Sequence, residues 1–438
     1  MIARFLLLVV GLTLLPAGGG LADEPIRLEE KFASGTIYRV KSRMKGTATL
    51  TVPSEKDKKE GESLTKTAAS TIDYDERILE VDADGLPSKT LRIYRTIDFR
   101  KDIGKQKFQN TLRPAVRRLV LVREMDLKVP FSPDGPLMVS EIELVRTDVF
   151  TPGLRGLLPA NPVKAGDTWK ASAAAVRELT DMQPEEGSLQ CKLHEVTKLD
   201  GRNVADIGIA GSVRGVSEDG PVRHEINGRF YFDIEAKCLS YISIQGKQSF
   251  LDKDGKSTGA IEGTFTLTRQ ANVKPADLGE ESIRGLKLEP DDENTLLLYE
   301  NEDLGVRFLH PRRWKVAGIQ GRQLMIDADD GNGILLTPEA LAKIPSAPQF
   351  AKEAEAVIRS QKGRIIGTTD PRRISAVGRE IDQFAIDAVM SDKRLLLDYY
   401  IVRQKDFGAT VMARLTPDGV RAMRPEVERI AKSVVVTK

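Results

Sequence analysis

Histidine and cysteine are scarce in this chain, whose 438 residues include three histidines and two cysteines. Because the histidines are scattered along the sequence, acid–base catalysis would have to rest on carboxylates. Familiar catalytic and nucleotide-binding strings are missing as well, among them a His-Glu-x-x-His helix, a Walker loop and a Cys-x-x-Cys pair. We therefore predict no catalytic residue, no metal site and no cofactor, and a protein that is not an enzyme.

The sequence also lacks an excess of charge of one sign. Lys and Arg number 66 against 64 Asp and Glu, which is a net charge of +2 with histidine neutral. Nucleic-acid binding requires a concentrated basic face that neutralises phosphates. The composition therefore argues against nucleic acid as a partner.

Long apolar runs are confined to the amino terminus. Arg4 precedes an apolar run at 5–15, and a glycine tract and Gly20-Leu21-Ala22 follow it. This is the pattern of a secretory signal peptide over residues 1–22, so we predict an exported protein, periplasmic or extracellular, after cleavage near Ala22. As a membrane anchor the run would fall short of the roughly 20 residues that cross a bilayer. No later stretch is apolar enough, so we predict no membrane span.

Cys191 and Cys238 leave two states open. In an exported protein they can form a disulfide between two strands of the same predicted sheet. That bridge requires the two Cα atoms to lie within about 7 Å of each other, which depends on the order of the strands. The alternative is a pair of free thiols.

Strand-like alternation of apolar and polar residues dominates residues 23–270, with turn-forming pairs such as Asp200-Gly201 between the strands. We predict strands at 36–52, 67–81, 90–99, 105–111, 188–199, 203–216, 222–233, 237–250 and 259–269. The charged excursion at 55–62 is interpreted as an exposed hairpin tip, and 139–149 as a further strand. This region is therefore expected to be a mainly antiparallel β domain, either a curved sheet or an open half-barrel.

A pivot loop at 153–169 separates two sets of strands. Pro159 and Pro162 prevent strand pairing there. The leucines of the loop are expected to form a short helical turn that covers the sheet, and its tryptophan to begin the second set of strands. The candidate ligand-covering residues are Leu154, Leu157, Leu158 and Trp169.

The composition shifts to Pro, Gly, Asp and Glu over 271–294, which is typical of an interdomain linker. An α/β domain is expected over 295–438. Its predicted helices are 348–361, capped by Ser346, and 417–433, capped by Thr416 and kinked or split by Pro425. Its predicted strands are 296–300, 306–310, 323–327, 333–337, 364–369, 378–389, 394–403 and 409–415.

The string Phe308-x-His310-Pro311-x-x-Trp314 in this second domain resembles the signature of the PsbP-like α/β/α sandwich, which is shared with the Ran-binding Mog protein. In that family the string is structural, because its aromatic residues seat a turn against the sheet. His310 stands where the family has an aromatic residue. The family consists mostly of binding and assembly factors, so the resemblance implies a non-enzymatic role.

A second string, Leu158-Pro159-x-x-Pro162-Val163-Lys164-x-Gly166-Asp167-x-Trp169, is similar to one in exported bacterial β-rich proteins of unknown function. The curved sheet of those proteins resembles that of LolA-like lipoprotein carriers. The resemblance implies a curved sheet with a concave face.

The expected function is that of an exported, soluble, non-catalytic binding or assembly protein of the cell envelope, with a protein or an apolar ligand as its partner. Within this class, the alternative is a carrier that holds an apolar or lipid-like ligand on the concave face of the first sheet. A hydrolase built on carboxylates is the alternative from a different class.

Overall fold

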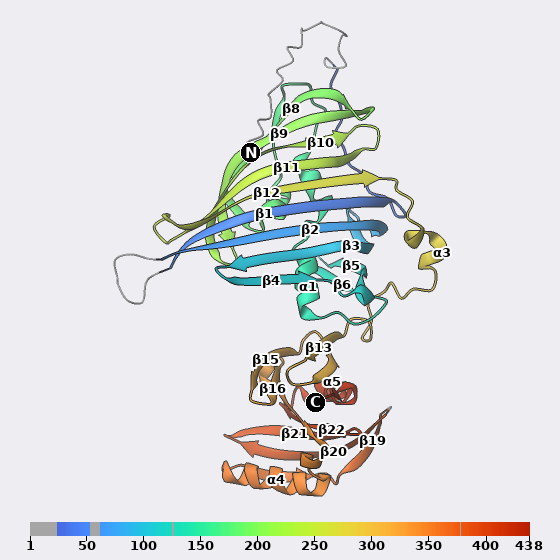
Figure 1. The fold of residues 1–438 in the computed structure, drawn as a ribbon, viewed down its shortest axis with the longest axis vertical. Helices are drawn as coiled ribbons and strands as arrows, with labels where there is room; N and C mark the ends of the chain where they lie inside the picture. The colour runs from blue at the N-terminus through green and yellow to red at the C-terminus, as the bar shows by residue number, and fades with distance from the viewer. Residues whose placement is uncertain (1–23, 53–61, 125–126, 377) are drawn as a thin grey trace, which may run out of the picture.

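The computed structural model describes residues 24–52, 62–124, 127–376 and 378–438. The predicted signal peptide and most of the charged tip at 55–62 lie outside these ranges. Over the described residues the fold is mainly antiparallel β, with one large open sheet in each half of the chain (Figure 1).

A twelve-stranded sheet forms the first half of the described chain, in the order β6-β5-β3-β2-β1-β12-β11-β10-β9-β8-β7, with β4 also paired to β3. Its strands are β1 (Ile37–Val52), β2 (Glu62–Val81), β3 (Pro87–Ile103), β4 (Gln106–Thr111), β5 (Arg118–Glu124), β6 (Leu127–Phe131), β7 (Thr168–Lys170), β8 (Gln183–Leu199), β9 (Arg202–Ser217), β10 (Gly220–Asp233), β11 (Cys238–Leu251) and β12 (Ser257–Ala271). The neighbours are antiparallel, and most of them are consecutive hairpins. Because β6 and β7 each pair with one strand, the sheet is open.

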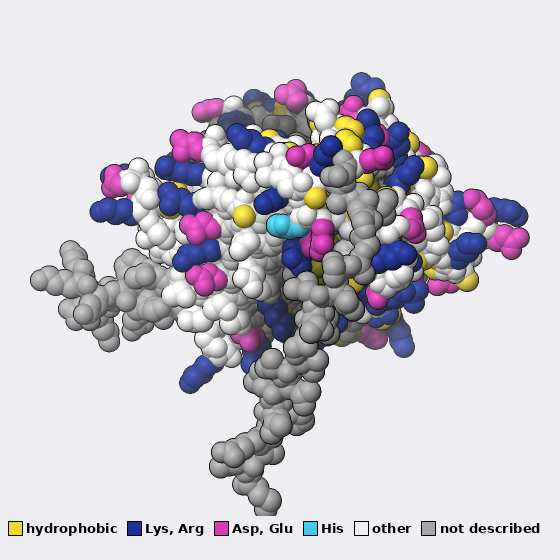
Figure 2. Space-filling model, turned by 90° about the horizontal axis from the view of Figure 1, so that it is seen from above, with side chains coloured by type: hydrophobic (Ala, Val, Ile, Leu, Met, Phe, Trp, Pro, Cys, Tyr) yellow, Lys and Arg dark blue, Asp and Glu magenta, His cyan; other side chains and the backbone are white. Residues whose placement is uncertain are grey.

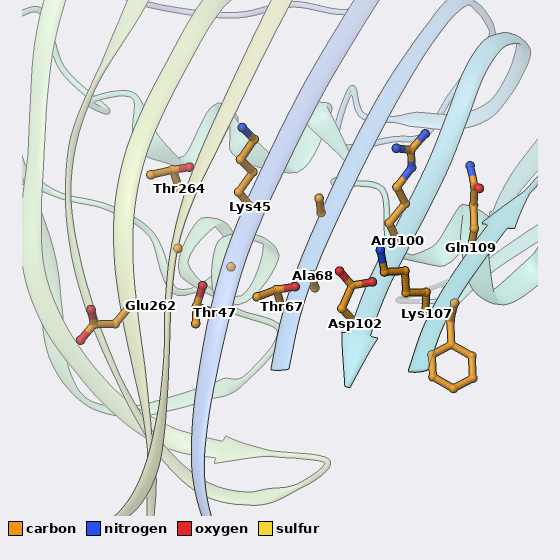
Figure 3. A pocket seen from close by; sticks show the side chains of 14 residues that line it. Lys45, Thr47, Thr67, Ala68, Arg100, Asp102, Lys107, Gln109, Glu262 and Thr264 are labelled. Atoms are coloured by element: carbon orange, nitrogen blue, oxygen red, sulfur yellow. The ribbon is translucent and has the colours of Figure 1, made fainter. Parts of the chain in front are cut away.

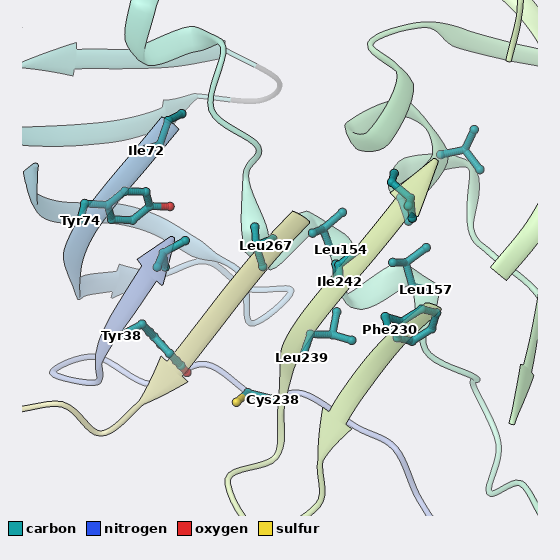
Figure 4. Close-up of a cluster of buried hydrophobic side chains, with 14 of the residues drawn as sticks. Tyr38, Ile72, Tyr74, Leu154, Leu157, Phe230, Cys238, Leu239, Ile242 and Leu267 are labelled. Atoms are coloured by element: carbon teal, nitrogen blue, oxygen red, sulfur yellow. The ribbon is translucent and has the colours of Figure 1, made fainter. Parts of the chain in front are cut away.

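The chain's own helical segments fill the inner, concave face of this sheet. They are η1 (Pro114–Val116), α1 (Val139–Arg146), η2 (Thr151–Leu157) and α2 (Ala173–Thr180). Figure 4 shows part of the resulting core, in which residues of η2 lie close to strands β10 and β11: Leu154, Leu157, Phe230, Leu239 and Ile242. The inner face is therefore a packed protein core.

A row of glycines crosses the middle of the sheet. Gly46 of β1 pairs with Gly263 of β12, which pairs with Gly246 of β11. A Cβ atom on Gly263 would lie 2.6 Å from the carbonyl oxygen of Lys45, which is closer than a side chain tolerates. The absence of side chains along this row lets the strands bend sharply together.

The segment predicted as a linker, 271–294, packs partly against the outer face of the first sheet. It contains η3 (Ala276–Leu278) and α3 (Glu280–Ile283). Leu278 is buried against Leu91 and Val120, and its carbonyl oxygen accepts a hydrogen bond of 2.8 Å from Nη1 of Arg77. This part of the segment is held in place rather than free.

The second half of the chain contains an eight-stranded sheet in the order β15-β16-β17-β22-β21-β20-β18, with β19 also paired to β20, and a three-stranded sheet in the order β13-β14-β23. The elements are β13 (Leu297–Asn301), β14 (Val306–His310), β15 (Lys315–Gln320), β16 (Gln323–Asp327), η4 (Asp329–Gly331), β17 (Gly333–Ala340), η5 (Leu341–Lys343), α4 (Ala347–Ser360), β18 (Arg364–Thr368), β19 (Arg372–Ala376), β20 (Arg379–Met390), β21 (Lys393–Arg403), β22 (Phe407–Leu415), α5 (Val420–Ser433) and β23 (Val435–Val436).

One helix packs on each face of the eight-stranded sheet. Successive residues of a strand point to opposite faces, and on β21 Tyr399 packs in the cluster that contains α4, whereas Tyr400 packs in the cluster that contains α5. Ser346 caps α4 as predicted, because its side chain accepts a hydrogen bond from the backbone N–H of Gln349.

The two halves meet at a small contact. The backbone N–H of Leu298 donates to the carbonyl oxygen of Leu137 at 2.8 Å. The guanidinium of Arg312 donates to the carbonyl oxygen of Thr295 at 3.1 Å and to that of Pro130. A single arginine thus ties the second half to β6 of the first sheet.

Two sequence predictions of secondary structure are wrong. The predicted strand at 139–149 is a helix over most of its length, because the Glu141 carboxylate accepts a hydrogen bond of 2.8 Å from the backbone N–H of Met138 and closes a capping box. The closing helix starts at Val420 rather than at 417. Asn332 accepts the backbone N–H of Thr416 at 2.8 Å, so Thr416 is held outside the helix. Pro425 lies inside α5 and does not split it.

The disulfide alternative for Cys191 and Cys238 does not hold either, because both cysteines are free and buried. Cys191 lies on β8 and Cys238 on β11, with β9 and β10 between them. Three strand spacings amount to about 14 Å, which exceeds the reach of a disulfide.

Denatured, unreduced protein is therefore expected to release two equivalents of thiol to a chromogenic disulfide reagent. Burial raises the pKa of both thiols to about 12, so the native protein should react slowly at pH 8. A count of zero thiols in the denatured protein would show that the strand order is different.

Candidate functional site

A hollow of about 810 Å³ lies on the outer face of the first sheet, over strands β4, β3, β2, β1 and β12 (Figure 3). On β1, Tyr38 and Val40 point into the core. Because side chains alternate along a strand, Lys45 and Thr47 point to the opposite face. The hollow is therefore separated from the packed interior by the sheet itself.

A second hollow of about 500 Å³ continues from the first over β11, β10 and β9, and the two share Glu262, Gly263 and Thr264. Together they form one trough that follows the glycine row across the strands. Between β4 and β10 it spans six strand spacings, or about 29 Å. We call this feature the outer trough.

Two rows of outward side chains, one on each side of the glycine row, form the walls of the outer trough. The first row, in register from β4 to β10, is Lys107, Asp102, Thr67, Thr47, Glu262, Lys247 and Glu225. The second row, in the same order, is Gln109, Arg100, Ala69, Lys45, Thr264, Gln245 and Asn227. Ala69 is the only apolar residue among these wall positions.

Some of the wall charges pair within the sheet. Lys247 pairs with Glu262 at 3.0 Å, and this hydrogen bond raises the pKa of the lysine ammonium group. Arg100 pairs with Asp98 at 2.8 Å. Within the described ranges, no ion pair is formed by three other wall residues, Lys45, Asp102 and Lys107. These three side chains remain available to a ligand.

Acidic and basic side chains are mixed over the face of the molecule that Figure 2 shows. The same mixture occurs along the outer trough, whose two walls together carry four cationic side chains and three carboxylates. A nearly neutral trough is better suited to an uncharged ligand that forms hydrogen bonds than to a highly charged ligand.

The pivot loop lies on the inner side of the sheet. Leu154 and Leu157 of η2 are buried in the core, whereas Leu158 is half-buried. Trp169 is half-buried on β7, and its indole N–H donates to the carbonyl oxygen of Leu157 at 2.8 Å. The structure thus brings the four candidate residues together, with the indole bonded to the backbone of η2.

A pocket of about 520 Å³ lies beside the pivot loop, between residues 27–30, the end of η2 and the start of α2. We call it the pivot pocket. The approach of η2 to α2 is close, because a Cβ atom on Gly156 would lie 2.0 Å from Oγ of Ser172. Its walls combine aliphatic side chains with three arginines and three glutamates.

A buried ionic cluster lies under the inner face of β2 and β3. The Arg92 guanidinium donates to Glu76 at 2.7 Å and to Asp148 at 2.7 Å, and it stacks on the ring of Tyr74 at 4.4 Å. Burial disfavours its charge, but the two carboxylates and the neighbouring tyrosines outweigh this effect and raise the pKa of Arg92. The cluster is a structural feature of the core.

A second buried pair joins Arg269 of β12 to Glu30, with 2.5 Å between Nη1 and Oε1. Arg269 also stacks on the ring of Tyr38 at 3.9 Å. Burial raises the pKa of the Glu30 carboxyl, and the neighbouring Arg269 opposes that shift. The pair fastens the amino-terminal segment to the core.

His310 is buried on β14, and its Nδ1 lies 3.0 Å from the carbonyl oxygen of Pro311. Burial lowers the pKa of its imidazole. Within the part of the chain that the structure describes, no group of three or more His, Cys, Asp or Glu side chains is placed to hold a metal ion. No helix among the described residues is both long and apolar enough to cross a membrane.

A Gly-x-Ser-x-Gly string occurs at 255–259, across the end of the β11–β12 turn and the first residues of β12. Ser257 donates to the carbonyl oxygen of Gly259 at 3.1 Å and is exposed. A nucleophile elbow lies in a turn between a strand and a helix. The turn at this string joins two strands, so the string does not have the structure of an elbow. The adjoining Asp252 carboxylate accepts the backbone N–H groups of Asp254 and Lys256, which defines a turn.

The sequence does not predict the outer trough, because its walls come from strands that are up to about 200 positions apart in the chain. Gly46, Gly246 and Gly263 are visible within predicted strands, and a glycine inside a strand signals a bend or a close approach. That these glycines align depends on the pairing register, which no local pattern specifies.

Comparison with known proteins finds no matching family model and no matching curated protein. Among solved structures, the PsbP protein of the cyanobacterium Synechocystis sp. PCC 6803 has 11% identity and a TM-score of 0.26, and covers 32% of this chain and 92% of its own. A protein of unknown function from Pseudomonas aeruginosa has 13% identity and a TM-score of 0.20, with 33% and 98% covered.

A third solved structure is also a distant match. Lipovitellin, in a structure concerned with lipid–protein interactions, has 8% identity and a TM-score of 0.32, and covers 66% of this chain and 30% of its own. At such low TM-scores these similarities establish neither a shared fold nor a shared function.

Proposed function

We propose that this protein is an exported, non-catalytic binding protein of the cell envelope that holds an extended, hydroxyl-rich polymer of the polysaccharide class in the outer trough. The observation that supports this proposal is the trough itself, whose walls come from the seven strands between β4 and β10 and carry hydroxyl, amide, ammonium and carboxylate groups. A sugar hydroxyl both donates and accepts hydrogen bonds, so it can satisfy every one of these group types.

The composition of the walls favours a polysaccharide over a protein partner. Protein interfaces are enriched in aromatic residues and Met and depleted in Lys, Glu, Asp, whereas the trough walls are rich in those charged residues. An extended peptide usually adds to a free sheet edge, where backbone groups are unpaired. The trough crosses strands whose backbone groups are already paired with one another.

The carboxylates in the larger hollow favour binding without hydrolysis. Asp102 and Glu262 stand in the same register row, with Thr67 and Thr47 between them. Three strand spacings place their strands about 14 Å apart. Glycosidases place their two carboxyl groups about 5–9.5 Å apart, so this pair is too widely separated to act on one glycosidic bond.

A carrier that used the concave face would need space there for an apolar ligand. In the structure the chain's own segments occupy that face, including Leu28, Phe32, Leu154 and Leu157. The buried Arg92 cluster adds ionised groups to the same interior. These observations favour the outer face as the ligand surface.

For the second half of the chain we propose a PsbP-like assembly module, on the string that ends in Trp314. The indole is buried, and its N–H donates to Glu426 of α5 at 2.8 Å. His310 lies 5.8 Å from Phe308, ring centre to ring centre, in the place of the family's aromatic residue. The indole thus bonds the turn to the closing helix, and the aromatic packing at this turn supports the structural role that the resemblance implies for the string.

Titration calorimetry with linear hexasaccharides of glucose and of N-acetylglucosamine tests the proposed ligand. We expect at least one of them to bind the wild-type protein, and the double variant Lys45→Ala/Asp102→Ala to bind it about 10- to 100-fold more weakly. Each lost hydrogen bond to a charged group contributes about 1.5 kcal/mol, or roughly a factor of ten in affinity.

The variant Arg43→Ala is the matched control, because it removes a cation from the same strand and face at a position outside the trough. Its affinity should equal that of the wild type. The proposal fails if neither hexasaccharide binds at millimolar concentration, or if the double variant binds as tightly as the control.

A further inference from the structure

The pivot pocket has the composition of a site for an amphiphile. Its volume of about 520 Å³ lies within the range of small-molecule sites, about 300–1,000 Å³. Aliphatic side chains form one part of its lining: Leu28, Leu86, Leu158, Pro152, Pro159 and Ala160. Leu28 is buried and Leu158 half-buried, so apolar surface extends from the core to the pocket.

The glutamates of the pocket already have partners in the protein. Glu29 pairs with Arg27 at 2.9 Å, and Glu30 pairs with Arg269 in the core. Glu178 accepts the backbone N–H of Phe150. A cationic ligand would therefore have to displace existing interactions.

Unlike these glutamates, Arg155 keeps most of its hydrogen-bonding capacity. It is half-buried in the lining, and its guanidinium donates to the carbonyl oxygen of Asp84 at 3.0 Å. Over the described residues it forms no ion pair with a carboxylate. A guanidinium offers five donors and binds carboxylates through two parallel hydrogen bonds, so most of its bonding capacity remains for an anion.

The amino terminus of α2 borders the same pocket, through Ser172 and Ala174. Ser172 caps the helix by accepting the backbone N–H of Ala175. The helix dipole adds partial positive charge at this end. Arg155 and the helix terminus therefore both favour a negative head group, while the leucines favour an apolar tail.

We infer that the pivot pocket is a second binding site, independent of the outer trough, and that its ligand class is an alkyl carboxylate with the carboxylate at Arg155 and the chain along Leu28, Leu86 and Leu158. The half-buried indole of Trp169 is bonded to η2, which ends at this pocket. The pivot loop is then one wall of a ligand site, as well as the cover of the core.

Calorimetry with decanoate, below the concentration at which it forms micelles, tests this inference on the full-length protein. Decanol has a similar tail without the charge, and acetate has the charge without the tail. We expect saturable decanoate binding with one site per chain, at least tenfold weaker binding of decanol, and no detectable binding of acetate.

Two variants locate the site. Arg155→Gln should weaken decanoate binding at least tenfold, and Ala160→Trp should abolish it by filling the pocket from an exposed position. Arg117→Gln, at an exposed arginine outside the pocket, is the matched control and should bind like the wild type. The thermal unfolding midpoint of each variant shows whether it is folded.

The inference is overturned if wild-type protein shows no saturable decanoate binding, if decanol binds as tightly as decanoate, or if folded Arg155→Gln or Ala160→Trp protein retains wild-type affinity. Hexasaccharide binding in the trough involves none of these positions. Failure here would therefore leave the polysaccharide proposal standing, and failure of the polysaccharide proposal would leave this one untouched.

Discussion

Replacement of Arg92 by methionine is expected to lower the free energy of unfolding by about 3–5 kcal/mol, the cost of removing one partner from a buried ion cluster. Arg92 is nearly inaccessible and bonds both Glu76 and Asp148. Without it, two buried carboxylates would lose the guanidinium that bonds both of them. Urea unfolding followed by circular dichroism provides the measurement.

The control for this prediction replaces the whole cluster. Arg92→Met combined with Glu76→Met and Asp148→Leu removes the charges together, and apolar replacement of a complete buried cluster is often neutral or stabilising. We expect the triple variant to recover most of the lost stability. A loss of no more than about 0.5 kcal/mol for Arg92→Met alone, which is the ordinary range for a surface substitution, would contradict the buried cluster.

The replacement Leu157→Ala is expected to cost about 2–5 kcal/mol, the range for a leucine deleted from a packed core. Leu157 is 1% exposed and lies among residues of β10 and β11 (Figure 4). Its removal would leave a cavity between η2 and the sheet. The same urea titration would show the change as a shift of the midpoint at constant slope.

The neighbouring Leu158→Ala is the matched control. Leu158 is half-buried, so its truncation removes less contact and should cost about 1 kcal/mol or less by the area it buries. Because Leu158 lines the pivot pocket, the same variant should weaken decanoate binding. Equal losses of stability in the two variants would show that η2 is not seated in the core as described.

Much of the strand succession can be predicted from the sequence. The long strands after the pivot loop alternate apolar and polar residues and are separated by turn-forming pairs, so β9, β10, β11 and β12 fall where the pattern places them. Helix α4 is similarly predictable, because Ser346 and the following Pro348 mark its first turn.

The errors have identifiable causes. The pattern over 139–149 fits a strand or a helix, and the hydrogen bond that the Glu141 carboxylate accepts from the backbone N–H of Met138 favours the helix. The sequence pattern predicts no element over 173–180, although alanine is the strongest helix former. A helix of this length depends on tertiary packing, which in α2 buries Ala175 and Val176. The start of α5 depends on Asn332, which is 84 positions from Thr416.

Neither binding site can be read from local sequence. The outer trough requires the register between Gly46 and Gly263, whose pairing a local pattern does not encode. The pivot pocket is lined by residues from five parts of the chain, and the free bonding capacity of Arg155 is visible only in three dimensions. The sequence does mark the pivot loop itself, through its prolines and leucines.

Covalent lysine footprinting tests the central claim, that the outer trough is the ligand surface, most directly. Lys45 and Lys107 are exposed in the trough, and Lys253 is an exposed lysine in the β11–β12 hairpin outside it. With a saturating hexasaccharide, acetylation of Lys45 and Lys107, quantified by mass spectrometry, should fall at least threefold while that of Lys253 stays unchanged. Unchanged acetylation of Lys45 and Lys107 in protein that has bound the sugar would contradict the account.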